Sequence, residues 1–575
     1  MSEKKSLNVI ENILTEAKAY TSIELIESAV EAGKDLKHFP VQPLYLVVKD
    51  LPLDKISQTL PLMTKDQRKV CHTIDLWSKD NLDLEHFPRW IVATAECEDD
   101  KVRLEFASSS EFALFLKGKF NIWTFDVEDP LYPEHDNYFL TEDNLLLVEF
   151  DDECVYVEHV KKLISDLYTE MGVENAYAHL FKYVSEGFLT LQEEEFHFKK
   201  NFMNDFGFVD YFESLEVDNS FPSFSHIDHF ITSKKRITGE LQNISKEQGL
   251  HKNALMAFEK GFESIYEQLN KVTDEKRFQY LHFNFVRLIN AKATLDNSLK
   301  SGSVALTRTG NRTKERMILG YAYLMDFALK GEIKEFVADD SIFNLFEFTD
   351  VYKVGNSLIS LVQKEVKKNL RQFQFEGEDE TFVGSFWEDF LDNTFNEQVR
   401  YSENGRAEKA KAVSDVETYL TWKKRAELFN QSAPFISQFK VAFNKLVEEG
   451  KLSDTFYINY KIEEIDFEAI ILSSLANFLL GNYAKEDSAQ KMGLTVDEFK
   501  SFCNLVLTSE GEISLDDKID AKFEEFINNF GLSEIPDFKT YLLKIIQDQL
   551  SGYDVTTLTM DDFKHVGGPI ILNVL

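Results

Sequence analysis

The sequence predicts a mainly α-helical protein of stacked helical hairpins, superhelix-like in its N-terminal part, with a small α+β insertion near 100–155 and a helical C-terminal part. The 575 residues include only 11 Pro and 24 Gly, and a chain poor in helix-breaking residues favours helices over many short strands. Its 50 Phe and 21 Tyr can bury a large core, since each buried aromatic side chain removes about 150–250 Å² from water.

Short helices are expected to follow one another over the first hundred residues. Thr64 and Gln67 form a capping-box pattern ahead of an apolar run, which predicts the start of a helix. Leu51-Pro-Leu and Leu60-Pro-Leu follow each other closely, and each proline suits the first turn of a helix, where its missing N–H is not needed. A phrase ending in His-Phe-Pro occurs at 35–40 and again at 83–88, a spacing that also suits a helical repeat.

The pattern changes between 100 and 160. Lys101–Phe106, Asn121–Phe125 and Leu145–Phe150 are short apolar or alternating runs, which predict strands or extended loops. Helical periodicity resumes at about Val157 and ends near Gly207, where a glycine followed by an apolar residue is typical of a helix C-terminus.

Changes in composition suggest where the domains end. The stretch that begins Asp-Asn-Ser-Phe-Pro-Ser-Phe is the best linker candidate, and the acidic stretch Glu376–Glu380 is a further plausible break. We predict a helical-hairpin domain at 1–100, a mixed α/β and then helical domain at 101–217, a linker at 218–233, a helical domain with a basic segment at 234–398, a second linker at 399–412, and a C-terminal helical domain at 413–575.

The composition also bears on location. The net charge of −36 disfavours nucleic acid and anionic lipid as partners, because both are bound through clustered Lys and Arg. The four cysteines form no Cys-x-x-Cys pair, which fits reduced thiols in a cytoplasmic protein. The N-terminus lacks the apolar core of a signal peptide, and the most apolar stretch, Ala469–Gly481, is too short to span a bilayer. We therefore predict a cytoplasmic protein without a membrane span.

One segment reverses the overall charge. Residues 233–316 contain 16 Lys and Arg against 9 Asp and Glu. The cationic residues crowd around a predicted glycine-containing loop, at Arg308, Arg312, Lys314 and Arg316. Such a loop could hold a phosphate or carboxylate with guanidinium groups and backbone N–H groups. The alternative is that the segment packs against acidic residues of its own chain.

A predicted helix within this segment adds three ligand-binding candidates, His282, Asn284 and Arg287. Asn284, Arg287 and Asn290 recur every third residue, so they lie near one face of the helix. This polar face either lines a cleft or forms the solvent edge of an amphipathic helix.

No catalytic motif is present. The sequence lacks Gly-x-Gly-x-x-Gly, Gly-x-x-x-x-Gly-Lys-[Ser/Thr], Gly-x-Ser-x-Gly and His-Glu-x-x-His. The pairs Glu194–His197 and His226–His229 have metal-like spacing but no matching second pair. We therefore predict no catalytic residues, no cofactor and no metal.

Three stretches, Leu51–Trp90, Glu193–Val217 and Gly331–Leu370, together resemble a bacterial family of unknown function whose members are long, soluble and helical. The first stretch is also similar to the intracellular helical domain of magnesium transporters and to flagellar motor-switch helices. That second resemblance implies regulation or protein interaction.

These observations favour a non-catalytic interaction or regulatory scaffold with a protein partner. The competing hypothesis is a receptor or enzyme for a small phosphate- or carboxylate-containing ligand that uses the basic segment. Metal-dependent regulation through surface carboxylates is a third.

Overall fold

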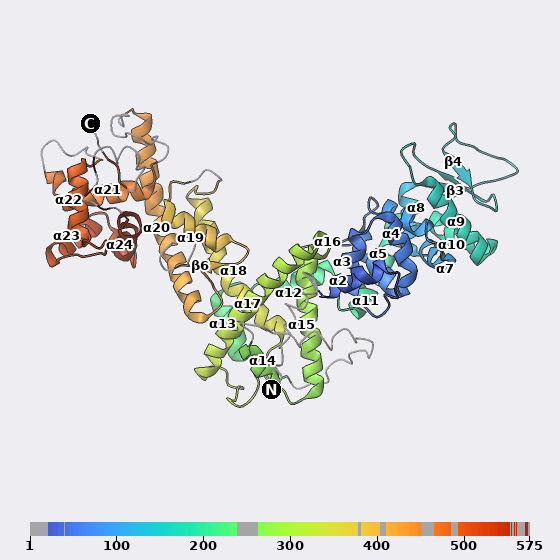
Figure 1. The fold of residues 1–575 in the computed structure, drawn as a ribbon, viewed down its shortest axis with the longest axis horizontal. Coiled ribbons are helices and arrows are strands. Elements are labelled where there is room, and N and C mark those ends of the chain that lie inside the picture. The colour runs from blue at the N-terminus through green and yellow to red at the C-terminus, as the bar shows by residue number, and fades with distance from the viewer. Residues whose placement is uncertain are drawn as a thin grey trace. The chain divides into compact units, whose positions relative to one another are not determined.

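The computed structural model describes residues 21–39, 41–237, 263–377, 381–402, 410–450, 465–484, 493–552, 554, 557, 559 and 570–572 (Figure 1). The chain divides into two compact units, each described separately below. Unit 1 comprises 1–219, 231–317 and 328–353, and unit 2 comprises 220–230, 318–327 and 354–575. The predicted mainly α fold with small β insertions is confirmed.

Unit 1 is built from helices and two small sheets. Its elements are α2 (Thr21–Glu31), α3 (Val41–Asp50), α4 (Leu53–Thr59), η1 (Leu60–Leu62), α5 (Lys65–Leu76), β1 (Trp77–Ser78), β2 (Asn81–Leu82), α6 (Phe87–Ala95), α7 (Asp100–Ala107), α8 (Ser110–Lys119), β3 (Asn121–Thr124), β4 (Tyr138–Leu140), β5 (Leu146–Glu149), α9 (Val157–Met171), α10 (Val173–Ser185), α11 (Phe188–Asp205), α12 (Tyr211–Asp218), α14 (Glu263–Asn270), α15 (Glu275–Leu295), α16 (Ser298–Ser301) and η3 (Ile342–Asn344). The division between the units falls within or beside α13 (Phe224–Ser233), α17 (Ser303–Leu329) and α18 (Phe348–Gln372).

The predicted start of α5 is confirmed. The Thr64 hydroxyl accepts the Gln67 N–H at 3.1 Å, and the Gln67 side chain accepts the Thr64 N–H at 2.7 Å. The Gln67 amide also donates to the carbonyl oxygens of Leu36 and Phe39. One side chain therefore caps α5 and fastens the preceding loop to it.

The expectation of a strand at Lys101–Phe106 is wrong, because these residues form helix α7. Asp99 caps the helix by accepting the N–H groups of Lys101 and Val102. Val102 and Phe106, four residues apart, are both buried on one face. The cap and this helical spacing outweigh the apparent alternation of the short run.

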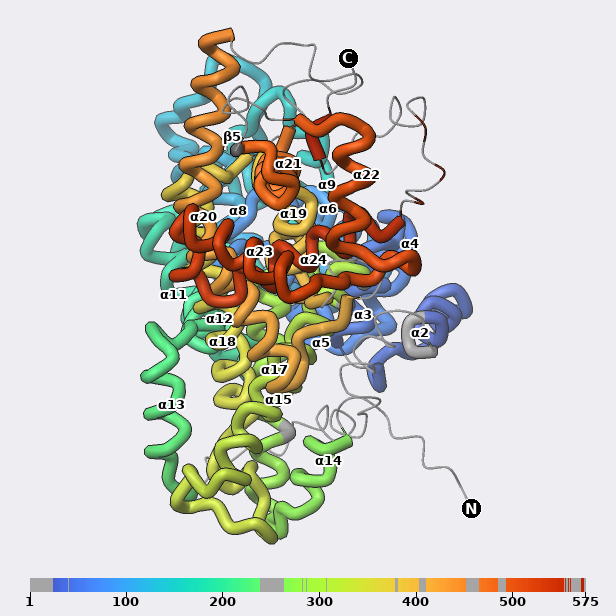
Figure 2. Tube along the Cα trace, turned by 90° about the vertical axis from the view of Figure 1, so that its left-hand side faces the viewer, coloured from blue at the N-terminus to red at the C-terminus, as the bar shows by residue number. Residues whose placement is uncertain are grey.

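The other two predicted strands are confirmed. β3 and β5 pair antiparallel, and β4 pairs with the other edge of β5. This three-stranded sheet forms the small β insertion. Elsewhere in the unit α12 lies along α15 (Figures 1 and 2).

The centre of unit 1 is aromatic. Trp90 is fully buried, and its indole N–H donates to Asp75 at 3.0 Å. The Tyr45 hydroxyl donates to the other oxygen of Asp75. Phe87 and Phe115 stack nearby with ring centroids 4.7 Å apart. Asp75 thus satisfies two buried aromatic donors, which is how polar tips are accommodated in such a core.

Unit 2 comprises α19 (Ser385–Phe395), β6 (Arg400–Tyr401), β7 (Lys411–Ala412), α20 (Val416–Glu448), α21 (Phe467–Leu479), η7 (Asn482–Ala484), α22 (Val496–Val506), α23 (Asp517–Asn529), η8 (Leu532–Glu534) and α24 (Phe538–Leu550). Trp387 and Trp422 are its largest fully buried side chains, and the Trp422 indole N–H donates to the Thr394 hydroxyl at 3.0 Å.

Three predicted breaks can be compared with the structure. Segment 218–233 contains α13. Within 399–412 lie β6 and β7, whereas 403–409 are outside the described residues. The acidic stretch 376–380 is described only as far as Gly377.

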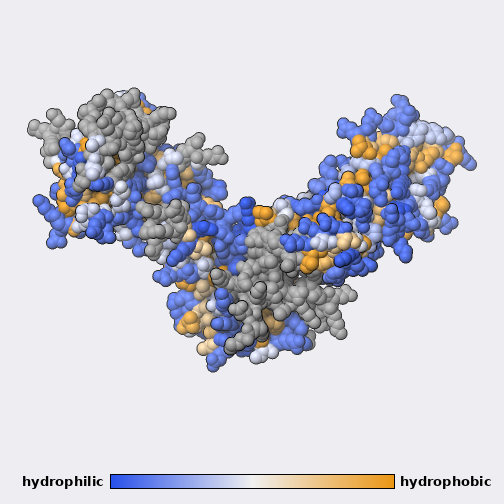
Figure 3. All heavy atoms as spheres, in the orientation of Figure 1, coloured by the Kyte–Doolittle hydropathy of each residue, from blue (hydrophilic) through white to orange (hydrophobic). Residues whose placement is uncertain are grey.

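Hydrophilic residues cover most of the described surface that Figure 3 shows, with smaller apolar patches between them. Among the helices in the described ranges, none combines the length and the apolar character needed to cross a membrane.

Candidate functional site

The predicted cationic loop at 308–316 is instead part of helix α17, so that expectation is wrong. Gly310 is buried within the helix, where a missing side chain allows close packing. Arg312 pairs with Asp296, which also accepts the Thr309 hydroxyl at 2.7 Å. Arg308 is exposed and Lys314 is half-buried. A helix cannot present the row of free backbone N–H groups that the loop was expected to supply.

Arg316 is a half-buried residue of unit 1. Burial lowers the pKa of its guanidinium to about 10, and Tyr352 and Asp218 act in the opposite direction. The Tyr352 hydroxyl donates to Asp218 at 2.7 Å, and Lys292 contacts the same carboxylate oxygen at 2.6 Å. Asp218 therefore balances much of the positive charge on this part of α15 and α17.

The polar face of α15 is directed into the protein rather than to solvent. Asn284 accepts the Thr349 N–H at 3.1 Å, which satisfies the first turn of α18. Asn290 is buried and donates to the Gly207 carbonyl at 2.8 Å. Arg287 pairs with Glu213. His282 lies on α15, but its side chain is outside the described part of the chain.

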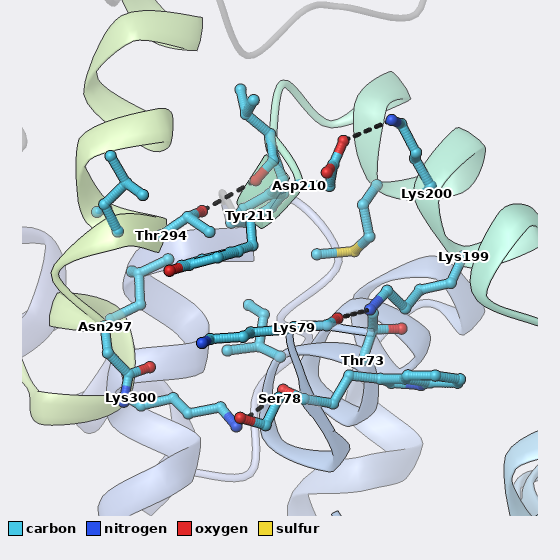
Figure 4. A pocket seen from close by; sticks show the side chains of 18 residues that line it. Thr73, Ser78, Lys79, Lys199, Lys200, Asp210, Tyr211, Thr294, Asn297 and Lys300 are labelled. Atoms are coloured by element: carbon cyan, nitrogen blue, oxygen red, sulfur yellow. Dashed lines mark hydrogen bonds and ion pairs between the residues drawn. The ribbon is translucent and has the colours of Figure 1, made fainter. Parts of the chain in front are cut away.

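The residues predicted as a ligand site are thus spread over α15 and α17, and most contact their own unit. A different cleft of about 310 Å³ lies at the C-terminal end of α15. Its walls are the end of α5 with β1 and the turn after it, the C-terminal half of α11, the segment 208–211, and residues 293–300 (Figure 4). All of these segments belong to unit 1.

Four lysines line this cleft, Lys79, Lys199, Lys200 and Lys300, against a single acidic residue, Asp210. Lys200 and Asp210 pair with each other at 2.7 Å. Three positive charges therefore remain without a carboxylate from the lining, in a protein whose net charge is −36.

Lys199 is the most buried of the four, with 8% of its surface exposed. Its ammonium group donates to the Lys79 carbonyl oxygen at 3.1 Å and lies 4.4 Å from the centre of the Trp77 ring. Neither contact neutralises the charge. Burial lowers the pKa of Lys199 to about 8, a shift that the negative charges of Glu111 and Asp210 oppose.

Lys300 and Lys79 are held in different ways. Lys300 donates to the carbonyl oxygens of Asp75 and Trp77 at 3.1 and 3.0 Å, and burial lowers its pKa. Lys79 has a left-handed backbone with φ 61°, and its ammonium group lies 4.4 Å from the centre of the Tyr211 ring. Figure 4 shows Lys79 between Tyr211 above and Lys300 below.

One residue that lines the cleft, Trp77, is 4% exposed, and its buried indole N–H has no acceptor among the described residues. A buried donor without an acceptor costs about 1–3 kcal/mol. The gathering of cations in one cleft is the chemistry that receives a phosphate or carboxylate oxygen.

Within the described residues of the predicted basic segment, 233–237 and 263–316, only the stretch 293–300 lines the cleft. The other walls come from two stretches that the family resemblance had marked, around Trp77 and around Lys199. Their lysines were missed because a lysine on a predicted helix is normally solvated. The described residues contain no group of three or more His, Cys, Asp or Glu that could hold a metal ion.

A family model with the description "Family of unknown function (DUF6178)" matches residues 2–565. No curated protein and no solved structure matches the chain. The predicted membership of a helical family of unknown function is confirmed. The predicted similarity of 51–90 to magnesium-transporter and motor-switch helices is not shown and stays a prediction.

Proposed function

The chain belongs to DUF6178, a family of unknown function, and we propose that its lysine-lined cleft binds a small anion that carries a phosphate or carboxylate group. The observation that supports this most strongly is Lys199, a buried ammonium group that contacts a carbonyl oxygen and two aromatic rings. An uncompensated buried charge is unfavourable, and a bound anion relieves that cost.

The lining suits a compact anion rather than a nucleic acid. A lysine ammonium group is a compact charge that can donate hydrogen bonds to oxygen atoms in several directions. Lys79, Lys199 and Lys300 surround a volume of only about 310 Å³. This proposal develops the small-anion hypothesis but moves its site from 308–316 to the cleft. The scaffold and metal-regulation hypotheses stay predictions.

Anions should raise the melting temperature of the protein, and replacing Lys199→Met should abolish this effect. Methionine keeps most of the buried stem of the side chain but removes the charge. We would measure melting with inorganic phosphate, pyrophosphate, sulfate and citrate, each against sodium chloride of equal ionic strength. A ligand at a hundred times its Kd stabilises by about 2.7 kcal/mol.

The matched control is Lys101→Met, because Lys101 is an exposed lysine on α7 away from the cleft. It should retain the full response to anions. If no anion raises the melting temperature of the unmodified protein beyond the chloride control, the proposal is wrong. An equal response in Lys199→Met and Lys101→Met would place the anion elsewhere.

Binding should weaken above about pH 8. A bound anion prefers the charged form of Lys199, whose pKa in the free protein is about 8, so the charged form is present below that pH and lost above it. Between this pKa and the higher pKa of Lys199 in the complex, each pH unit should weaken binding by about tenfold through this group, and the loss should level off above the pKa of the complex. Sulfate is the suitable probe because it does not titrate between pH 6 and 10. A flat profile across this range would exclude Lys199 as the charged contact.

A further inference from the structure

A second cavity of about 230 Å³ lies beside α11, and its lining comes chiefly from α5, α6, α7, α8 and α11 of unit 1. Besides Glu105, which pairs with Arg68, two carboxylates line it, Glu111 from the first turn of α8 and Glu195 from α11. These two are only 6% and 8% exposed. Glu195 lies one helical turn before Lys199, so the same face of α11 carries an acidic group into this cavity and a basic group into the cleft.

These carboxylates lack a cationic partner. Neither Glu111 nor Glu195 is within 4.0 Å of a Lys, Arg or His nitrogen in the described residues. The Oε1 atom of Glu111 is buried without any hydrogen bond, and so is the hydroxyl of Thr94, a fully buried residue that lines the same cavity. Two residues that line the cavity thus each have a buried oxygen without a hydrogen-bond partner, whereas Glu195 has a hydrogen bond with the Ser110 side chain.

The arginine in the lining, Arg68, already has hydrogen-bond and ion-pair partners. Arg68 pairs with Glu105 at 2.6 Å and donates to the carbonyl oxygens of Leu60 and Met63 at 3.0 and 2.6 Å. It therefore cannot turn to the carboxylate pair without leaving three acceptors unsatisfied. Burial, and then the charge of Glu111, raise the pKa of Glu195 to about 7. The pair consequently holds a proton at a pH where carboxylates are normally ionised.

Two lysines also line the cavity. Lys65 is exposed on the first turn of α5, and Lys69 lies one turn further, with its ammonium group 4.7 Å from the centre of the Phe202 ring. Helix α8 begins in the cavity, where Ser109 caps it by accepting the Phe112 N–H at 3.2 Å. A helix N-terminus favours negative charge, and Glu111 in the first turn supplies it. One cavity therefore contains an acidic pole, Glu111 and Glu195, and a basic pole, Lys65 and Lys69.

We infer that this cavity binds a free amino acid, whose ammonium group is received by Glu111 and Glu195 and whose carboxylate faces Lys65 and Lys69. A zwitterion matches both poles at once. A simple amine would leave the lysines unused, and a simple anion would be repelled by the carboxylate pair. The Thr94 hydroxyl supplies a further polar contact for the ligand.

Binding should release a proton at pH 6–7, because the ligand ammonium favours the ionised form of Glu195. The groups around Glu195 are Glu111 and Ser110 on α8, Lys69, Arg68 and His72 on α5, Glu105 on α7, Lys182 and Tyr183 on α10, and Lys199 on its own helix. Burial lowers the pKa of His72 to about 3, so it stays neutral in this range. Affinity should therefore rise from pH 6 to pH 8.

The test is isothermal titration of the full chain with the twenty common amino acids, with N-acetylglycine and methylammonium as probes that each lack one pole. We expect binding by at least one amino acid, little by either half-probe, and proton release in buffers of different ionisation enthalpy. Glu111→Gln should weaken binding at least tenfold. Glu193→Gln, the same change on the exposed side of α11, should leave binding unchanged.

Glu111→Gln should remain folded, because it replaces an unpaired buried carboxylate by a neutral group of the same shape, and its melting temperature without ligand should not fall. Glu195→Gln is the second variant, and it should also abolish proton release. Absence of binding by every amino acid would overturn the inference, as would a response to calcium or magnesium chloride but to no amine. Both outcomes are independent of sulfate binding in the cleft, which Lys199→Met tests separately.

Discussion

Replacing Gly384→Ala is expected to lower the free energy of unfolding of unit 2 by about 3–5 kcal/mol. Gly384 precedes α19 with φ 93° and ψ 159°, a backbone region that side chains other than hydrogen occupy at a cost of about 1–3 kcal/mol. A Cβ added there would also lie 2.5 Å from Cδ of Glu468. Overpacking of this kind costs about 1–3 kcal/mol more.

The clash matters because Glu468 holds the start of α19. This fully buried side chain accepts the Phe386 N–H at 3.1 Å and the Ser385 hydroxyl at 3.3 Å, and it is also bonded to Gln549. If Glu468 moves away from the new methyl group, the first turn of α19 loses its acceptor. Strain, overpacking and a lost cap therefore act together at one position.

Hydrogen exchange measured by mass spectrometry would locate the effect in peptides from α19 and α21, which is preferable to a single melting curve for a chain of two units. Gly531→Ala is the matched control. Gly531 has a left-handed backbone with φ 70°, and a Cβ there would meet nothing within 4 Å, so the cost should be only about 1–2 kcal/mol. In a Glu468→Ala background the extra cost of Gly384→Ala should disappear. Equal costs for the two glycines would refute the account.

Helices and loops could be predicted from the sequence only where neighbouring residues carry the signal. The capping box at Thr64 and Gln67 was recognisable because both partners lie within one turn of each other. The same local logic fails at Lys101–Phe106, because the cap at Asp99 lies outside the run whose alternation suggests a strand. It fails again at Arg308–Arg316, where a glycine suggested a loop but the segment forms part of α17.

The candidate sites depend on burial, which a sequence does not show. Three polar residues of α11 would be expected on its solvent-exposed side from the sequence. All three lie on its buried face: Gln192, Glu195 and Lys199. Their partners are distant in the chain: the Lys79 carbonyl receives Lys199, and the Leu82 N–H donates to Gln192. Only the packing of α11 on α8 and the β1–β2 turn brings these groups together.

Replacing Arg277→Lys is expected to lower the free energy of unfolding of unit 1 by about 3 kcal/mol. Arg277 lies in the basic segment on α15 and is 4% exposed. Its Nε and one terminal nitrogen donate to the Phe343 carbonyl at 3.0 and 2.9 Å, and that nitrogen also reaches the Phe346 carbonyl at 3.1 Å. Lysine keeps the charge but cannot direct donors to both carbonyls in this fork geometry. At least one buried carbonyl is left without a partner, at about 1–3 kcal/mol each.

The consequence should extend to the start of α18. The loop before this helix carries Glu347, which pairs with Arg277, and Thr349 in the first turn donates its N–H to Asn284. Faster hydrogen exchange in peptides covering 341–352 would show this loosening. Arg236→Lys is the control, since Arg236 is half-exposed and contacts only Asp340 of this loop in the described structure, at 2.7 Å, and exposed pairs contribute about 0–1 kcal/mol. If Arg277→Lys and Arg236→Lys lowered the free energy of unfolding equally little, Arg277 would not be needed to stabilise unit 1 and could serve in ligand binding instead. A selective effect of Arg277→Lys would instead show that this part of the segment holds its own unit together, and that ligand binding must come from residues such as Lys300 at its other end.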